Sequence, residues 1–361
     1  MPQKIPATIV TGFLGAGKTT LIRALIENAD GRRIALIINE FGDLGVDGEI
    51  LKGCGIDGCA DDDVIELSNG CICCTVAEDF LPAIQKLIER EDAPDHIVIE
   101  TSGLALPQPL VRAFAWPDIR TRVTVDGVVA VVDGPAVAAG RFAADEAAVD
   151  RQRAADDGLD HETPLGELFE DQLACADMVV VSKTDRLDDA AVGTLSSRIK
   201  GQVREGVPVL PTRMGRMSPS VLLGLGMGAE DDLKGRREIH HHHHEHGDHQ
   251  DDHHHHHGDH HQDHGHDAFE SFVVELPEIT DPARLARMVE TAIGDHGLLR
   301  VKGFAAVAGK PMRLVLQAVG PRVDTHFDRP FGDDPRGTRL VVIGLAGLDR
   351  AAIESTLTQA A

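Results

Sequence analysis

The segment GFLGAGKT, residues 12–19, constrains the fold of this chain more than any other stretch. It matches the pattern G-x-x-x-x-G-K-[ST] and lies between an apolar run, Ala7–Val10, and a helical pattern that begins at Thr19. In this context the glycines let backbone N–H groups wrap around phosphate oxygens, and the helix presents its positive end to the same anion. A glycine turn without a ligand is the alternative, but the full motif in its strand–loop–helix context favours phosphate binding.

The residue types of this loop predict separate roles around a bound nucleotide. Lys18 should reach the β- and γ-phosphates, and the Thr19 hydroxyl should hold Mg²⁺. A later apolar strand ends in Glu100, where hydrolases with this loop keep an acidic residue linked to Mg²⁺. We therefore predict Lys18, Thr19 and Glu100 as catalytic residues. The predicted nucleotide contacts in the loop are Gly12, Gly15, Ala16, Gly17, Lys18, Thr19 and Thr20.

A second nucleotide signal follows the run Met178–Val181. Ser182-Lys183-Thr184-Asp185 is similar to the guanine-reading pattern N-K-x-D, in which the Asp carboxylate accepts hydrogen bonds that only guanine can donate. We predict that Ser182, Lys183 and Asp185 contact the base, with a surface turn as the alternative. Because Ser replaces Asn at the first position, the strictness of GTP over ATP stays open.

The hydrophobic pattern predicts an α/β domain followed by a smaller α+β domain. The first part alternates helical patterns with short Val/Ile-rich runs that are apolar throughout, as strands buried on both faces are. We expect a P-loop NTPase with a mostly parallel sheet over residues 1–215, a linker over 216–267, and one sheet with two helices over 268–361. The strand candidates are Ala7–Val10, Ile34–Ile38, Ile97–Ile99, Val128–Val132, Met178–Val181, Pro208–Leu210, Phe269–Leu276, Arg300–Val307, Arg313–Val319 and Arg339–Gly344.

Cysteines gather before a predicted helix. Cys71, Cys73 and Cys74 precede the capping-box pattern Thr75-Val76-Ala77-Glu78, which predicts a helix to about Arg90. A helix N-terminus favours the thiolate, which is the metal-binding form of cysteine. We predict these three residues as metal ligands, with a redox pair or inert buried thiols as alternatives. Cys54 and Cys59 form a weaker chelating pair or two free thiols.

Two further segments point to ion binding. Residues 39–47 follow the second strand and carry three carboxylates, beginning with Glu40, which favours a switch that orders around the γ-phosphate and Mg²⁺ over an ordinary polar loop. Residues 240–266 hold sixteen of the twenty histidines, mixed with Asp and Glu. This composition forms no packed core and suits divalent transition metals, so we interpret it as a low-affinity metal reservoir, with a mere spacer as the alternative.

Composition excludes several classes of partner. The net charge of −24 disfavours nucleic acid and anionic membranes as partners. No apolar run reaches membrane-spanning length, and the phosphate-loop strand begins too early to leave room for a signal peptide. We therefore expect a cytoplasmic protein.

Taken in order, the segments G-F-L-G-A-G-K-T, N-E-F-G, G-C-I-C-C, E-T-S-G and S-K-T-D resemble those of the CobW family of metallochaperone GTPases, over nearly the whole chain. The resemblance implies GTP hydrolysis with Mg²⁺. It also implies that the thiolates of Cys71, Cys73 and Cys74, with Glu40 nearby, hold a metal that hydrolysis releases.

Three features favour the branch of this family associated with aerobic cobalamin biosynthesis: the pair Cys54 and Cys59, the histidine run, and Ser182. This branch implies Co²⁺ as the metal and a cobaltochelatase or another metal-accepting protein as the partner, with a nucleotide-dependent dimer as a further possibility. The alternatives are a zinc chaperone of the same family, a His-rich metal store without nucleotide gating, and a small-molecule kinase.

Overall fold

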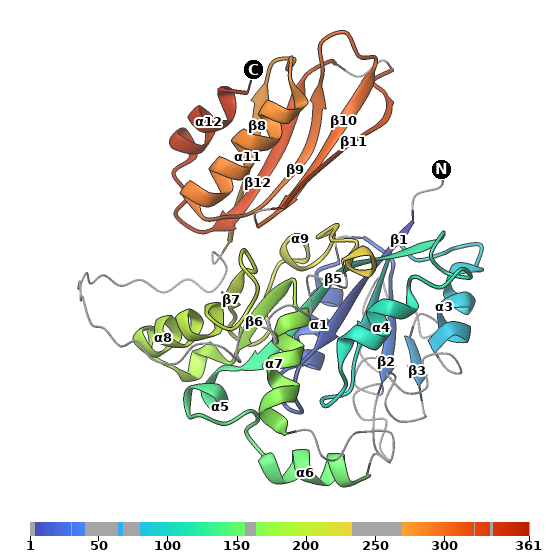
Figure 1. The fold of residues 1–361 in the computed structure, drawn as a ribbon, viewed down its shortest axis with the longest axis vertical. Helices are drawn as coiled ribbons and strands as arrows, with labels where there is room; N and C mark the ends of the chain where they lie inside the picture. Colours follow the sequence, from blue (N-terminus) through green and yellow to red (C-terminus); the bar gives the residue numbers. More distant parts are fainter. Residues whose placement is uncertain are drawn as a thin grey trace, which may run out of the picture. The chain divides into compact units, whose positions relative to one another are not determined.

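A computed structural model of the chain describes residues 4–29, 31–39, 64–67, 80–155, 164–232, 269–320, 322–332 and 335–360. These residues form two compact units, Met1–Arg237 and Glu238–Ala361, which Figure 1 shows coloured along the sequence. The first unit extends past residue 215, where the sequence predicted the domain to end. In the described part of the chain, no helix is both long and apolar enough to cross a lipid bilayer.

The first unit is built on a seven-stranded sheet with the order β3-β2-β4-β1-β5-β6-β7. Every neighbouring pair is parallel, which confirms the predicted α/β sheet and places all carboxyl ends of the strands at one edge. The strands are β1 Ile5–Thr11, β2 Ile34–Asn39, β3 Val64–Leu67, β4 His96–Glu100, β5 Val123–Asp133, β6 Met178–Ser182 and β7 Val209–Pro211.

Helices cover this sheet through aliphatic and phenylalanine side chains. Ala7 and Ile9 of β1 pack in one core with Phe80, next to α3, and Leu110 of α4. A neighbouring core joins Val181 of β6 to residues of α7 and α8. The helices are α1 Lys18–Glu27, α3 Leu81–Ile88, α4 Pro107–Ala113, α5 Gly134–Ala138, α6 Glu146–Ala155, α7 Leu165–Cys175, α8 Asp189–Lys200 and α9 Pro219–Leu222.

The second unit is an antiparallel sheet with the order β11-β10-β9-β12-β8 and two helices on one face, and the sequence predicted the single sheet and the two helices. Leu285 of α11 and Ile353 of α12 pack in one core with alternate strand residues such as Val301 and Leu340. The elements are β8 Phe269–Leu276, α11 Pro282–His296, β9 Leu298–Ala306, β10 Met312–Val319, β11 Arg322–Pro330, β12 Thr338–Leu345 and α12 Arg350–Thr358.

Two strands and one helical region differ from the expectation. The sequence did not predict β3, which has only four residues, or β11, whose polar sequence RVDTHFDRP is mostly exposed at the edge of its sheet. In the described residues between 134 and 175 the structure has three helices, α5, α6 and α7, which the sequence analysis did not separate. The N-cap of α5 is Asp133, which belongs to the site described below.

Candidate nucleotide-binding site

The loop between β1 and α1 has the backbone that the glycine pattern demands. Gly12, Gly15 and Gly17 have φ values of 137°, 73° and 99°, in the region that side chains disfavour. A Cβ on Gly12 would lie 2.1 Å from the carbonyl oxygen of Val131, so no larger residue fits there. The loop therefore lies directly against β5, with α1 starting immediately after it.

The three predicted catalytic residues lie together at the ends of β1 and β4. The Lys18 ammonium donates hydrogen bonds to the carbonyls of Gly12 at 2.8 Å and Phe13 at 3.3 Å. Its Nζ is 4.0 Å from Oε1 of Glu100, and the Thr19 hydroxyl donates to that same oxygen at 3.3 Å. Because the side chains of Lys18 and Glu100 are only 7% and 8% exposed, the charges face each other away from bulk water. The site has a cation for phosphate and an adjacent anion.

The residues present fit a bound Mg²⁺. Hard divalent cations take oxygen ligands, and Thr19 and Glu100 supply a hydroxyl and a carboxylate. Thr11 ends β1, and Ser102 follows the end of β4 by two residues. Within the described residues, the buried hydroxyls of both have no hydrogen-bond partner. Oxygen atoms of this kind suit an ion that keeps several water ligands. Thr19 and Glu100 would hold the ion, which supplies positive charge against the phosphates.

Lys183 links the loop after β6 to the phosphate loop. Its φ of 57° is left-handed, and its Nζ donates to the carbonyl of Gly15 at 2.6 Å and to Oδ2 of Asp133 at 2.6 Å. Asp133 ends β5 and is buried; its Oδ1 accepts from the N–H of Ala136 and so caps α5. Sequence reasoning missed Asp133. The signal was present, since an Asp followed by Gly-Pro at a strand end is a helix N-cap pattern.

Ser182, the departure from the N-K-x-D pattern, is also a link to the phosphate loop. Its buried hydroxyl lies 2.5 Å from the carbonyl oxygen of Ala16 and 3.1 Å from that of Val132, and it can donate to one of them at a time. Asp185 lies in the short 3₁₀ helix Thr184–Arg186, is exposed, and makes no hydrogen bond or ion pair with another described residue. The contact of Asp185 with a base stays a prediction.

A loop that the sequence did not single out completes this region. The N–H and the hydroxyl of Thr184 both donate to the carbonyl of Thr212, which joins the loops after β6 and β7. Lys183 and Met214 are the two non-glycine residues with positive φ in the described chain, and both line the same cavity of about 60 Å³. Backbone strain of this kind is concentrated at functional sites. The other residues that line the cavity are Gly17, Thr20, Leu21, Val131, Val180, Ser182, Thr212 and Gly215.

Comparison with known proteins agrees with this geometry. Residues 6–211 match the family described as "CobW/HypB/UreG, nucleotide-binding domain", and residues 269–361 match the "Cobalamin synthesis protein cobW C-terminal domain". The chain belongs to the CobW family of metallochaperone GTPases. Its nucleotide-binding unit is thus that of a P-loop GTPase, as the sequence predicted.

Several CobW-family relatives match nearly end to end. A "Zinc chaperone CobW" of Sinorhizobium sp is 55% identical over 98% of this chain and 97% of that protein. A protein of the same name from Pseudomonas aeruginosa is 52% identical over 99% and 92%. Among solved structures, Zn(II)-bound YjiA GTPase from E. coli is 23% identical, covers 99% of both chains and has a TM-score of 0.40.

The residues predicted to bind the client metal lie outside the described residues. These are Glu40, Cys71, Cys73 and Cys74, together with Cys54, Cys59, the switch residues 40–47 and the histidine run. In the ranges that the structure describes, no three His, Cys, Asp or Glu residues form a group suited to a metal ion, and Cys175 is a buried thiol of α7. The metal ligands therefore stay a prediction.

Proposed function

We propose that this chain is a zinc chaperone whose affinity for the metal is controlled by Mg-GTP. The order of the sheet carries the proposal. β2 and β3 are neighbours, with Asn39 opposite Leu67, and both end at the same edge as the phosphate loop and Glu100. Glu40 directly follows β2, and Cys71 comes four residues after β3 ends. Both candidate metal-binding segments thus follow strands that end at the sheet edge where the nucleotide is proposed to bind, and this supports the proposal.

Zinc is the first candidate for the metal because two relatives with more than half of their residues identical are named zinc chaperones. Thiolates are good ligands for Zn²⁺, which also binds more tightly than Co²⁺ to most sites of this kind. Cobalt, the metal predicted from the sequence, is the second candidate, since the match over residues 269–361 is to a domain named for cobalamin synthesis.

The proposed cycle starts with Mg-GTP, which Asp185 selects over ATP. GTP brings the predicted thiolate ligands together, and the metal binds with release of thiol protons. Hydrolysis removes the γ-phosphate, the metal site loosens, and the metal passes to a client metalloprotein in the cytoplasm. Hydrolysis by the chain alone should be slow, because no arginine among the described residues is evident at the phosphate loop as a cis-acting finger.

The test is a metal titration against a chromophoric chelator under reducing conditions, with Mg-GTP, Mg-GDP or no nucleotide. We expect Mg-GTP, and not Mg-GDP, to tighten one Zn²⁺ site at least roughly 100-fold, a coupling within the usual range for linked sites. Co²⁺ titrated in the same way shows which metal the gated site prefers relative to its supply.

Three variants locate the site. Cys73→Ala should abolish the gated site, whereas Cys175→Ala, the same change in α7, should keep it. Removal of residues 240–266 should lower the number of weak sites and leave the gated one. If nucleotide makes no difference to any site, gating is wrong and a His-rich metal store becomes the better interpretation. If Cys73→Ala keeps full gated affinity, the thiolate assignment is wrong.

A further inference from the structure

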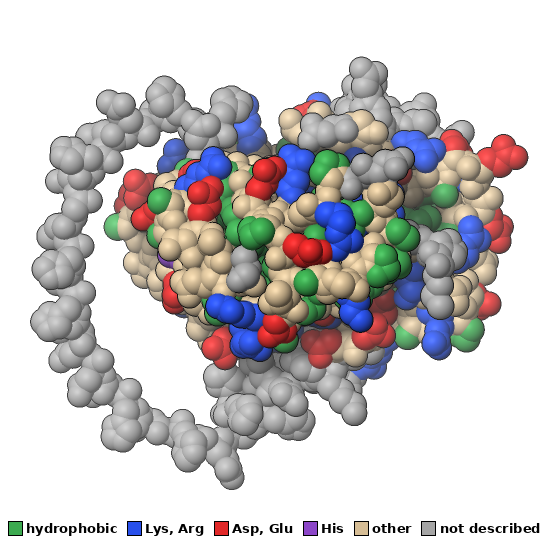
Figure 2. Space-filling model, turned by 90° about the horizontal axis from the view of Figure 1, so that it is seen from above, with side chains coloured by type: hydrophobic (Ala, Val, Ile, Leu, Met, Phe, Trp, Pro, Cys, Tyr) green, Lys and Arg blue, Asp and Glu red, His purple; other side chains and the backbone are tan. Residues whose placement is uncertain are grey.

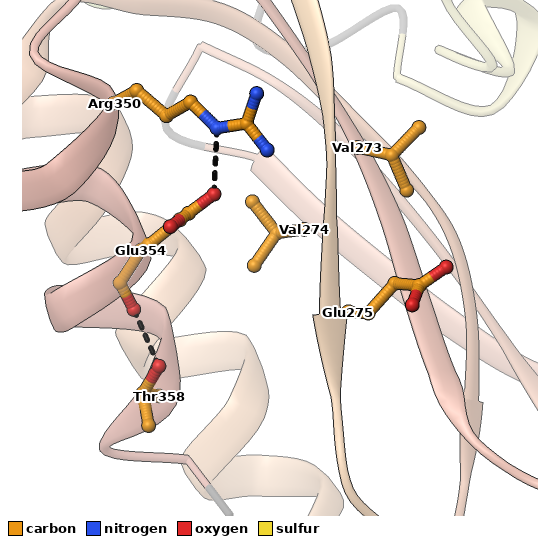
Figure 3. Close-up of a pocket in the computed structure, with 6 residues that line it drawn as sticks. All are labelled: Val273, Val274, Glu275, Arg350, Glu354 and Thr358. Atoms are coloured by element: carbon orange, nitrogen blue, oxygen red, sulfur yellow. Dashed lines mark hydrogen bonds and ion pairs between the residues drawn. The ribbon is translucent and has the colours of Figure 1, made fainter.

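The groove between β8 and α12 of the second unit, about 430 Å³ in volume, has its polar side chains paired with each other. Figure 3 shows Arg350 donating to Glu354, at 2.7 Å, and the Thr358 hydroxyl donating to the Glu354 carbonyl, at 2.6 Å. Figure 2 shows acidic and basic side chains interspersed on the face that it draws, so neither charge dominates there. Among the described residues that line this groove, no buried side-chain polar atom lacks a partner.

One side chain of the first unit differs in this respect. Oε1 of Gln152, in α6, is buried and has no hydrogen-bond partner within the described residues. A buried acceptor without a donor costs free energy, so such an atom in a folded chain needs an explanation. A group that arrives with the substrate and donates to this oxygen is one explanation, and the surroundings of Gln152 favour it.

Helix α6 packs against the phosphate loop through an apolar core. Val149 of α6 is fully buried and lies in one core with Phe13 of the loop and Leu104 of the turn after β4. The Phe13 ring also stacks on Phe142, four residues before α6, with 6.0 Å between the ring centroids. Gln152 comes three residues after Val149 and therefore projects from the same side of the helix. This packing turns the Gln152 side chain toward the phosphate loop.

The Gln152 amide meets the phosphate loop at Gly103. A Cβ on Gly103 would lie 3.3 Å from Oε1 of Gln152 and 2.7 Å from the backbone nitrogen of Leu14, in the phosphate loop. Glu100, three residues before Gly103, is 4.0 Å from the Lys18 ammonium. The turn after β4 thus runs from the side chains that face the phosphates to the Gln152 amide. An oxygen at the end of this turn is placed to act beside a γ-phosphate.

The chemistry of the amide oxygen selects its partner. Oε1 accepts hydrogen bonds and does not take up a proton at neutral pH. The γ-phosphate of Mg-bound GTP is ionised and offers only acceptor oxygens, so it cannot satisfy Oε1. A water molecule can donate one hydrogen to Oε1 and still present a lone pair to phosphorus. Because enzymes accelerate phosphoryl transfer mainly by positioning and electrostatic stabilisation, a group that orients this water is a catalytic group.

We propose that Gln152 is a further catalytic residue of GTP hydrolysis, whose Oε1 orients the attacking water. The water oxygen forms a bond to the γ-phosphorus, and the bond between that phosphorus and the oxygen bridging to the β-phosphate breaks. The bridging oxygen stays with GDP, and one water proton passes to an oxygen of the departing phosphate, which leaves as inorganic phosphate. The amide stays neutral throughout. This role rests on GTP hydrolysis alone and does not require that zinc is the cargo.

The test is single-turnover hydrolysis of GTP with Mg²⁺ as the only divalent cation, together with equilibrium binding of GTPγS. Gln152→Met keeps the length and helix propensity of the side chain and removes the amide. We expect the rate at saturating GTP to fall at least roughly ten-fold and the affinity for GTPγS to change less than about two-fold, the pattern of an interaction made only in the transition state. An unchanged rate, or equal losses of rate and GTPγS affinity, overturns the proposal.

Urea unfolding of the nucleotide-free chain separates this role from a structural one. Because Oε1 has no donor within the described residues, an apolar group of similar shape should keep or raise the urea midpoint, whereas loss of a structural glutamine would lower it. Gln202→Met makes the same change at an exposed position after α8 and should alter neither the rate nor the midpoint. The proposal fails if Gln152→Met lowers the midpoint, or if Gln202→Met slows hydrolysis as much.

Discussion

Asp133 is the residue whose replacement tests the nucleotide site most sharply. Its carboxylate has two separate partners: Oδ1 caps α5 through the N–H of Ala136, and Oδ2 accepts from Lys183, whose Nζ also bonds the carbonyl of Gly15. Asp133→Asn keeps an oxygen for the cap. It replaces the second oxygen with an N–H donor that cannot bond an ammonium group. The substitution therefore removes the Lys183 contact alone.

The magnitude follows from the burial of the pair. The side chain of Asp133 is 1% exposed and that of Lys183 is 26% exposed, so water replaces the lost partner only in part. A hydrogen bond between charged groups contributes about 1.5–3 kcal/mol. We expect this loss to be divided between unfolding and nucleotide binding, because Lys183 holds the two loops that would enclose the nucleotide. If half appears in binding, the affinity for GDP falls roughly 4- to 12-fold.

The assay is equilibrium binding of a fluorescent GDP analogue, with urea unfolding of the same samples. The control is Asp188→Asn, because Asp188 caps α8 through the N–H of Ala191 and, among the described residues, shows no contact with the phosphate loop. We expect Asp188→Asn to bind GDP like the wild type. If Asp133→Asn also binds GDP within about two-fold of the wild type, the Lys183 link does not support the site and our reasoning about it is wrong.

Three further outcomes follow from the described contacts. Glu100→Gln should lower single-turnover GTP hydrolysis roughly 100-fold or more with little change in GDP affinity, since it removes a charge beside the phosphates and keeps the shape; an unchanged rate would contradict its role. Gly12→Ala should lower the free energy of unfolding by about 3 kcal/mol or more, because its Cβ meets a β5 carbonyl at 2.1 Å, whereas Gly140→Ala, with no atom within 4 Å, should lose only about 1–2 kcal/mol from its φ of 76°. The hydrogen bond from Arg313 lowers the pKa of Asp328 below its ordinary 3.8, so the pair stabilises the fold above pH 3.8 and this stabilisation is lost as pH falls through the lower folded pKa. Asp328→Asn should therefore lower the free energy of unfolding in urea by about 0.2–1 kcal/mol at pH 7. A difference between the variant and the wild type that persists at pH 2 would contradict this.

The sequence predicted the central strands because burial on both faces forces an apolar run. In β5, for example, the five consecutive residues from Val128 to Val132 are all aliphatic. Two of the edge strands escape this rule, since β3 is short and β11 is polar and covered by a neighbour on one side only. Their hydrogen bonds come from the neighbouring strand and leave no mark in their own composition.

The same limit applies to the site. The phosphate loop was predictable because its glycines, Lys18 and Thr19 fall within eight consecutive positions and each residue type has a fixed role. The contact of Asp133 with Lys183 joins residues 50 positions apart. It exists because β5 and β6 are neighbours with Asp133 opposite Ser182, and this register is a property of the sheet. A motif reports local chemistry, whereas a pair across two strand ends needs the strand order.

Residues 224–232 show how buried carboxylates can place a segment that composition assigns to a linker. Asp126, which is 3% exposed, accepts from the N–H groups of Gly224 at 2.5 Å and Gly226 at 2.8 Å. Glu230 accepts from the Thr124 hydroxyl at 2.6 Å and from the N–H of Val125 at 2.9 Å. Removing this segment would take two backbone donors from the buried carboxylate of Asp126 and the Glu230 acceptor from β5, which is costly. The glycine-rich segment therefore belongs to the nucleotide-binding unit, because its backbone donates to Asp126 of β5 and its own Glu230 accepts from β5.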